Sequence, residues 1–258
     1  MSLAHDAQIV KLGSLTEDAF LGGRVVVAQP ERGFRAGLDS VLLGASVREG
    51  AASLLDLGAG AGTAALIALA WSDTVNATLV ESDPTMATLA AQNLAANGFA
   101  ARARVIETDL TASGRVRADA GLRADSFAAV IANPPFYSGG TPSQQERRAA
   151  REMPAETLDL WVRTAAACTT PGGEVIFVHL AERLPDLLAA FTARFGAIAV
   201  LPFTPREGEA AHRVLVRGIK GSRTPLTLLA SRALHTPSGR AFRPEFEAVF
   251  RGHSRLVW

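Results

Sequence analysis

The sequence predicts an α/β protein with a mostly parallel sheet, helices on both faces of that sheet and an antiparallel hairpin at one edge. Two observations lead to this fold. From residue 53 to about 195, short apolar runs alternate with helical stretches, which is typical of a parallel sheet with crossover helices. Two further apolar runs, at 197–201 and 212–218, have no helical stretch between them. These last runs predict the antiparallel hairpin.

The N-terminal part of the chain is expected to cover the binding site. Residues 1–50 are predicted to form this extension, and residues 51–258 the rest of the same structural domain. Residues 24–29 have the composition of a strand, which the proline after them ends. Asp39 or Ser40 can cap a helix formed by the apolar run that follows.

The core elements are bounded by glycine and proline. Gly98 follows a helical stretch and predicts its C-terminal stop, and residues 171–173, Pro-Gly-Gly, end the next long helix in the same way. The polar residues 111–126 are predicted to form a loop, and 225–229 to add an edge strand. Strands are expected at 53–57, 77–80, 103–106, 127–132, 174–179, 197–201 and 212–218, and helices at 64–71, 84–97, 155–169 and 184–195.

Composition and termini restrict the class of protein. Hydrophobic residues make up 48% and charged residues 20% of the 258 residues, as in ordinary globular proteins. No apolar run approaches the length that spans a bilayer, and the N-terminus lacks a signal core, so we expect a cytoplasmic protein with no membrane partner. The single cysteine, Cys168, excludes an intramolecular disulfide and a cysteine metal cluster, and the histidines have no metal-ligand spacing. We therefore expect no metal.

The charge of the chain is unevenly distributed. The net charge is only +1, but from His212 to the end nine Lys and Arg residues accompany two Glu residues. A basic end on an acidic body suggests an anionic partner such as nucleic acid. The alternative is a solvated, arginine-rich surface.

A glycine-rich segment, Asp56-Leu57-Gly58-Ala59-Gly60-Ala61-Gly62, connects the first core strand to its helix. Alternating glycines let a backbone approach a ligand closely, and the N-terminus of the following helix points toward it. Dinucleotide-binding loops have the spacing G-x-G-x-x-G, whereas this segment has G-x-G-x-G after an acidic residue. The alternative is a simple Gly/Ala-rich turn.

Two acidic residues follow the next two strands. Glu81 ends the strand at 77–80, and a carboxylate at that position can accept hydrogen bonds from both hydroxyls of a ribose. Asp109 comes just after the strand at 103–106. For Asp109 an ordinary loop aspartate is a competing interpretation.

The segment Asn133-Pro134-Pro135-Phe136 follows a strand that is apolar throughout. Because prolines cannot donate to a sheet, the strand must stop at Asn133, which leaves a rigid turn. The turn presents an amide, carbonyl oxygens and an aromatic ring at the carboxyl end of the strand, where open α/β sheets bind ligands. A proline turn that only caps a core strand is the alternative.

These segments resemble the class I S-adenosylmethionine-dependent methyltransferases. The glycine-rich segment is similar to their motif I, and the Asn-Pro-Pro-Phe turn to motif IV of members that methylate planar amino nitrogens. The resemblance implies a Rossmann-like sheet, S-adenosylmethionine as cofactor and direct transfer to an exocyclic amine. It implies that Asn133, Pro134 and Phe136 hold the acceptor, that Tyr137 lines its pocket, and that Asp56, Gly58, Gly60, Glu81, Asp109 and Asn133 lie at the cofactor.

The flanking segments resemble one family, the tRNA adenine-N6 methyltransferases that modify the adenine beside the anticodon of a valine tRNA. The resemblance rests on Gln29-Pro30, on the run from Gly33 to Asp39 with the leucines after it, and on the C-terminal Leu234-His235-Thr236 with Phe242 and Phe246. It implies adenine N6 in tRNA as the acceptor, and it places Arg35 and Asp39 near the cofactor.

Other acceptors and roles remain open from the sequence. Arg147 and Arg148 can bind the phosphates that flank a flipped base, or form a solvated helix face. A protein glutamine N5-methyltransferase and an rRNA guanine-N2 methyltransferase share the motif, but the separate helical domain of the former and the duplicated half of the latter are not visible here. The non-enzymatic alternative is a module that binds cofactor and RNA.

Overall fold

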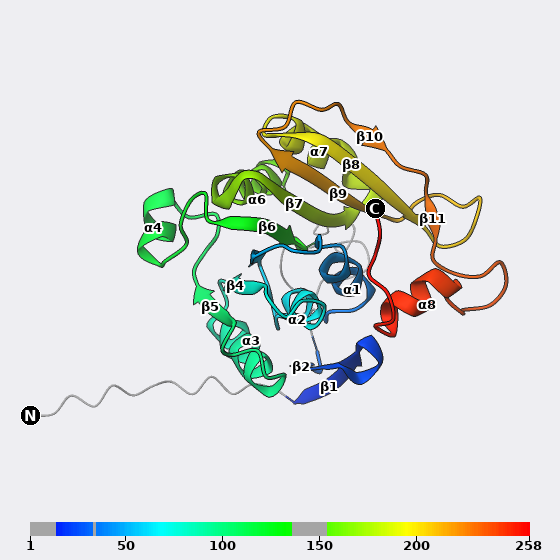
Figure 1. The fold of residues 1–258 in the computed structure, drawn as a ribbon, viewed down its shortest axis with the longest axis horizontal. Helices are drawn as coiled ribbons and strands as arrows, with labels where there is room; N and C mark the ends of the chain where they lie inside the picture. The colour runs from blue at the N-terminus through cyan, green and yellow to red at the C-terminus, as the bar shows by residue number, and fades with distance from the viewer. Residues whose placement is uncertain (1–13, 33–34, 136–153) are drawn as a thin grey trace, which may run out of the picture.

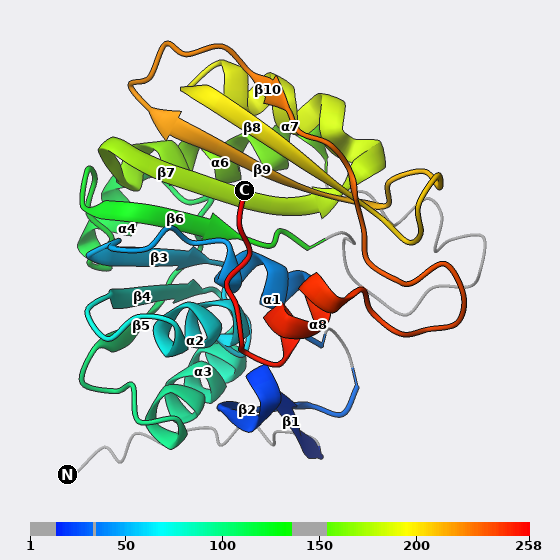
Figure 2. The same ribbon diagram turned by 45° about the vertical axis from the view of Figure 1, so that its right-hand side comes forward.

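The computed structural model describes residues 14–32, 35–135 and 154–258. A central sheet runs in the order β10-β8-β9-β7-β6-β3-β4-β5, with β11 also paired to β8 (Figure 1). Figure 2 shows this order from β10 at the top to β5 at the bottom. Its strands are β3 (Ser53–Leu57), β4 (Asn76–Glu81), β5 (Ala103–Glu107), β6 (Phe127–Ala132), β7 (Thr169–Leu180), β8 (Phe195–Thr204), β9 (Arg213–Lys220), β10 (Thr227–Leu228) and β11 (Arg232–Ala233).

The directions of the strands confirm the predicted fold class. β3, β4, β5, β6 and β7 are joined by parallel pairings. β9 lies between β7 and β8 and is antiparallel to both, which forms the edge hairpin. The predicted edge strand at 225–229 is present as the short β10, which pairs with Ala199 and Val200 of β8.

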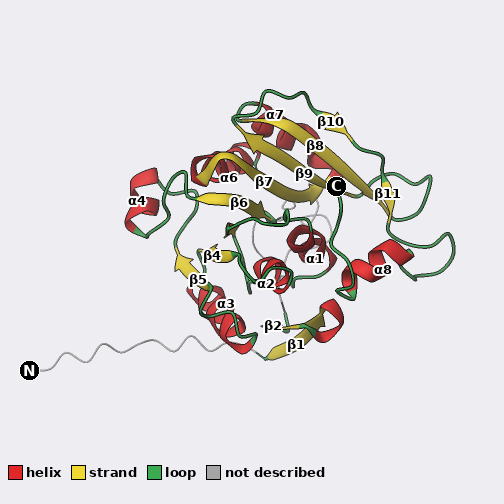
Figure 3. Cartoon of the chain, in the orientation of Figure 1, coloured by secondary structure: helices red, strands yellow, loops and turns green. Residues whose placement is uncertain are grey.

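Helices cover both faces of the sheet, and the period-2 pattern of the strands explains why. Leu54 of β3 belongs to the apolar cluster under α1, α2, α3 and α8, whereas Leu55 and Leu57 belong to the cluster under α6 and α7. A strand with helices on both sides is therefore apolar at most positions, and Asp56 is the exception among the buried positions of β3. The helices, red in Figure 3, are α1 (Leu38–Ala45), α2 (Thr63–Ala70), α3 (Pro84–Ala96), α4 (Gly114–Asp119), α6 (Ala155–Cys168), α7 (Leu184–Thr192) and α8 (Pro244–Phe250).

Three local predictions were wrong. Neither Asp39 nor Ser40 caps α1, because Gly37 occupies the N-cap position without a side-chain cap bond and both residues lie inside the helix. Residues 111–126 are not only a loop, because Ser113 caps the short helix α4 by accepting a hydrogen bond from the Val116 amide at 3.4 Å. The Pro-Gly-Gly segment at 171–173 does not separate a helix from a strand. β7 begins before this segment, at Thr169. The pairing of β7 with β6 shifts in register between Phe127 and Ala129.

The sequence did not predict β1 (Leu15–Phe20), which pairs with β2 (Val25–Pro30) in a separate two-stranded sheet. Asn93 of α3 and Asn97, the C-cap residue directly after α3, hold this hairpin by bonding its backbone as a neighbouring strand would. The Asn93 side chain accepts from the Ala28 amide and donates to the Ala28 carbonyl, both at 2.9 Å. The Asn97 side chain bonds the amide and carbonyl of Val26 at 2.9 and 2.7 Å.

Asn93→Ala is expected to lower the free energy of unfolding by about 2–4 kcal/mol. Asn93 is buried, and removing its side chain leaves several backbone groups without a hydrogen-bond partner. Its amide also donates to the Ala61 carbonyl in the glycine-rich segment at 3.0 Å. Asn97 is partly exposed, so Asn97→Ala should cost less, since water can replace the lost bonds. Unfolding in urea measures the free energy of unfolding of both variants. Equal losses in the two variants would contradict the larger role given to the buried Asn93.

Candidate active site

One cavity of about 320 Å³ lies at the carboxyl ends of β3, β4, β5 and β6. The site residues that the sequence predicts come from four separate segments. They meet in this cavity because parallel strands end at the same edge of the sheet. The lining includes Gly58, Gly60, Glu81, Asp109 and Asn133.

The glycine-rich segment approaches the neighbouring helix closely. Gly58 and Gly60 have φ angles of +65° and +55°, which glycine adopts without strain. A Cβ added at Gly58 would lie 2.3 Å from Cη2 of Trp161 on α6, so no side chain fits there. Trp161 also lines the cavity, and sequence analysis missed it. Only its place on the apolar face of α6 could have drawn attention to it, and that does not reveal its contact with Gly58.

Two carboxylates are fixed at the cavity by backbone amides. Glu81 accepts from the amides of Gly60 at 2.8 Å, Ser82 at 2.7 Å and Asp83 at 2.9 Å. Asp109 accepts from both the amide and the hydroxyl of Thr111 at 2.7 Å. Both side chains are therefore oriented before a ligand arrives, and each can still accept further hydrogen bonds.

Asp56 lines a small cavity together with Gln29, Ala36 and Asn133. It is only 2% exposed, and its carboxylate accepts from the Ala65 amide at 3.1 Å. Burial raises the pKa of Asp56 from about 3.8 to about 7, against the lowering effect of the amide and with a further contribution from the charge of Glu81.

Asp56→Asn is expected to stabilise the ligand-free protein in a pH-dependent way. Because the folded pKa is raised, the parent loses stability as pH rises from about 4 to about 7, and it keeps that deficit above pH 7. The advantage of the variant should grow across this window to about 2–4 kcal/mol and then stay constant. Unfolding at a series of pH values measures it, and a difference independent of pH would refute the argument.

Asn133 follows the last residue of β6 and lines every cavity described here. Its side-chain oxygen is buried and has no hydrogen-bond partner within residues 14–32, 35–135 and 154–258. A buried oxygen without a partner costs about 1–3 kcal/mol, so it points to a donor supplied by a ligand. Pro134, the next residue, is buried as well.

A second cavity, of about 480 Å³, shares Asn133 with the first. Arg35 and Asp39 line this second cavity and not the first. Arg35 is held by an ion pair with Asp18 and donates to Thr16 at 2.6 Å and to the Pro30 carbonyl at 3.3 Å.

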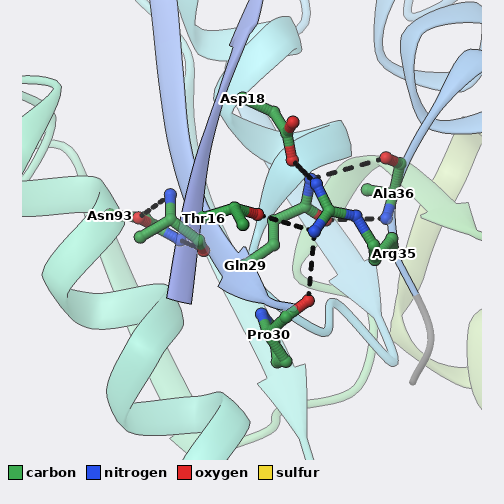
Figure 4. Close-up of polar contacts among 8 residues, drawn as sticks. Thr16, Asp18, Gln29, Pro30, Arg35, Ala36 and Asn93 are labelled. Atoms are coloured by element: carbon green, nitrogen blue, oxygen red, sulfur yellow. Dashed lines mark hydrogen bonds and ion pairs between the residues drawn. The ribbon is translucent and has the colours of Figure 1, made fainter. Parts of the chain in front are cut away.

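Gln29 fixes the segment beside Arg35. The Gln29 side chain donates to Asp18 at 2.8 Å and accepts from the Ala36 amide at 2.7 Å. Figure 4 shows how these contacts join β1, β2 and the segment that leads to α1. The hairpin therefore positions the residues at the entrance to α1.

Four of the predicted site residues, Phe136, Tyr137, Arg147 and Arg148, lie outside the described residues. Within the described part of the chain, no helix has the length and apolar character needed to cross a membrane. The same residues contain no group of three or more His, Cys, Asp or Glu side chains arranged to hold a metal ion.

Comparisons with known proteins agree on one family. Residues 38–201 match the family model described as methyltransferase small domain. A Citrobacter koseri protein is 29% identical over 80% of this chain and 89% of its own length. A protein of Escherichia coli O157:H7 (strain EC4115 / EHEC) is 30% identical over 79% of this chain and 89% of its own length. Both are named tRNA1(Val) (adenine(37)-N6)-methyltransferase.

Solved structures share the fold. The crystal structure of a predicted O-methyltransferase from Agrobacterium tumefaciens is 32% identical, with a TM-score of 0.74 over 85% of this chain and 98% of that one. A type I restriction-modification methyltransferase subunit from Streptococcus thermophilus has a TM-score of 0.60 at 14% identity, over 84% of this chain and 53% of that one. The second likeness concerns the fold alone.

Proposed function

The chain belongs to the methyltransferase small domain family, and from this premise we propose that it methylates N6 of an adenine in tRNA. The enzyme uses S-adenosylmethionine, whose sulfonium supplies an electrophilic methyl group. The observation that carries the proposal is the buried oxygen of Asn133, which has no hydrogen-bond partner among the described residues and belongs to a residue that lines both cavities. It provides one of the acceptors that an amino group needs, at the point where the two cavities meet.

The residues of the first cavity fit this cofactor. In the proposal, Glu81 accepts the ribose hydroxyls, Asp109 accepts the exocyclic amine of the adenine ring, and Gly58 and Gly60 allow the backbone to approach the ribose and the methionine part. Asp56 lies below the loop, where a buried carboxylate attracts the cationic end of the ligand. Support comes from the fixed carboxylates and from the space beside Gly60, where a Cβ would meet no atom of the described residues within 4 Å apart from its chain neighbours.

The turn at Asn133 performs the positioning in this proposal. The Asn133 side-chain oxygen and the Pro134 carbonyl accept the two N–H bonds of the amine, which directs its lone pair toward the methyl group. As the N–C bond forms, the bond between the methyl carbon and the sulfonium sulfur would break and its electron pair would stay on sulfur as a neutral thioether, while the two oxygens stabilise the positive charge that develops on the nitrogen. The nitrogen then releases one proton to water. Phe136 stacks on the base and Tyr137 lines its pocket.

An amine fits the turn better than a hydroxyl does, although the Agrobacterium tumefaciens relative is described as a predicted O-methyltransferase. A hydroxyl has one proton to donate, so one of the two oxygens would stay without a donor. A glutamine amide offers two N–H bonds, as adenine does. RNA is preferred because the relatives from Citrobacter koseri and Escherichia coli are named for tRNA.

The acceptor is tested by incubating the enzyme with labelled S-adenosylmethionine and either unmodified tRNA or total protein. We expect label in tRNA, and mass spectrometry of the digested nucleosides should identify it as N6-methyladenosine. Label found only in protein would favour the glutamine acceptor. Label on a guanine would favour the N2 alternative, and cofactor binding without any turnover would favour a non-catalytic module.

A further inference from the structure

Helix α6 lies on the face of the sheet opposite α1, α2 and α3, yet two of its buried side chains reach residues that line the first cavity. These side chains are Trp161 and Thr164, which share one face of the helix because they are three positions apart. Neither residue belongs to a motif of the sequence, and the proposed function gives neither of them a role. Their contacts fall on two different edges of the cavity.

Trp161 contacts the glycine-rich segment. A Cβ placed on Gly58 would lie 2.3 Å from Cη2, 2.9 Å from Cζ3 and 3.5 Å from Cζ2 of Trp161, so the outer ring of the indole lies directly against this backbone. Trp161 is packed in the apolar cluster under α6 and α7 and is only 7% exposed. Glycine has more conformational freedom to lose than any other residue. The indole therefore restricts a flexible segment on the side that faces α6.

Thr164 holds a second edge of the cavity. Its hydroxyl donates to the Leu110 carbonyl at 2.9 Å in a buried hydrogen bond. Arg117 donates to the same carbonyl at 3.2 Å. Leu110 lies between Asp109 and Thr111, and all three residues line the cavity. The segment that carries the Asp109 carboxylate is therefore anchored to α6.

The two contacts lie on either side of a strand. Gly58 follows β3 and Leu110 follows β5, and β4 lies between these two strands in the sheet. One helix thus contacts both edges of the cavity across β4, and a helix is a rigid element. The separation of the two edges depends on where α6 packs.

We propose that Trp161 and Thr164 are positioning residues for the cofactor, which set the distance between the glycine-rich segment and the segment that carries Asp109. The inference rests on the proposed function, in which S-adenosylmethionine extends from its methionine part at the former segment to its adenine ring at the latter. A site must hold its groups within about 0.5 Å of the productive geometry, and neighbours locked by packing provide that precision.

Calorimetric titration with S-adenosylmethionine, in the absence of RNA, tests the proposal. Trp161→Leu keeps an apolar side chain in the cluster but lacks the outer ring that meets Gly58, and it should weaken binding about tenfold. Thr164→Val removes the hydroxyl at nearly constant volume and should weaken binding about threefold to tenfold. Thr164→Ser keeps the donor and should keep the affinity of the parent. Unchanged affinity in both Trp161→Leu and Thr164→Val would overturn the proposal.

The kinetic constants separate positioning of the cofactor from a general loss of function. At saturating cofactor, the turnover numbers of Trp161→Leu and Thr164→Val should stay within about threefold of the parent, so that the loss appears in the KM of the cofactor. Val162→Ala is the matched control, because Val162 is fully buried on the same helix and does not line the cavity. This variant should unfold at a lower urea concentration and keep the affinity for the cofactor. An equal loss of affinity in Val162→Ala would overturn the proposal, because any loosening of α6 would then have the same effect.

A double-mutant cycle tests the contact itself. Gly58→Ala should weaken cofactor binding on the order of a hundredfold when Trp161 is present, but less than about tenfold in Trp161→Leu, because the atoms that would clash are absent. Equal losses in the two backgrounds would overturn the role of Trp161. A parent that binds no S-adenosylmethionine would refute the proposed function, whereas an acceptor other than tRNA would refute only the acceptor and leave these affinities unchanged.

Discussion

Asn133→Ala is expected to lower the turnover number by about a hundredfold to a thousandfold, while the dissociation constant of S-adenosylmethionine changes by less than about threefold. The magnitude is that of removing one preorganised partner of a developing charge. The truncated side chain removes the buried oxygen that has no other partner in the described residues, so the amine loses its orientation. Single-turnover rates and cofactor titration calorimetry measure the two quantities separately.

Asn133→Asp tests whether a hydrogen-bond acceptor at this position is what turnover requires. A carboxylate oxygen can accept an N–H bond at the same position, so this variant should keep far more activity than the alanine variant. Turnover of Asn133→Ala equal to that of the parent would refute the role of Asn133 in holding the amine.

Gly58→Ala is expected to weaken cofactor binding on the order of a hundredfold or more. The added methyl would lie 2.3 Å from Cη2 and 2.9 Å from Cζ3 of Trp161, in a backbone with φ +65°. The left-handed conformation alone costs an alanine only about 1–2 kcal/mol, so most of the effect comes from displacement of the loop or of Trp161. Calorimetric titration with S-adenosylmethionine measures the loss.

The matched control for this variant is Gly98→Ala. Gly98 has φ +76°, and a Cβ there meets no atom of residues 14–32, 35–135 and 154–258 within 4 Å apart from its chain neighbours, so the backbone strain is similar and the clash is absent. This control should lose about 1 kcal/mol of stability and keep its cofactor affinity. Equal affinity losses in the two variants would show that strain, and not the contact with Trp161, disturbs the site.

The sequence predicted the parts of the fold and of the site that local pattern controls. Apolar runs and glycine stops predicted the strands and helices, and residues directly after parallel strands, such as Glu81 and Asn133, had to meet at one edge of the sheet. The same reasoning could not find Trp161, because its contact with Gly58 depends on how α6 packs across the sheet.

Long-range pairing explains the remaining differences. Asp39 and Arg213 are separated by 174 positions, and no local pattern indicates that they form an ion pair at the second cavity. The hairpin β1–β2 was missed in part for a similar reason, because side chains in and directly after α3 supply the hydrogen bonds that hold it. The basic C-terminal part looked like a charged surface in the sequence, yet many of its partners lie in distant segments.

Because Trp161 lies against Gly58 at the wall of the cavity, its fluorescence should report cofactor binding. An indole ring at the wall of a binding cavity changes its fluorescence when a ligand replaces water near it. Trp71 is engaged by Arg24 and Arg255, and Trp258 by Arg217, so their emission should stay nearly constant when the cavity fills. Subtracting the spectrum of a Trp161→Phe variant would isolate the signal, and cofactor loading could then be followed in real time without any label.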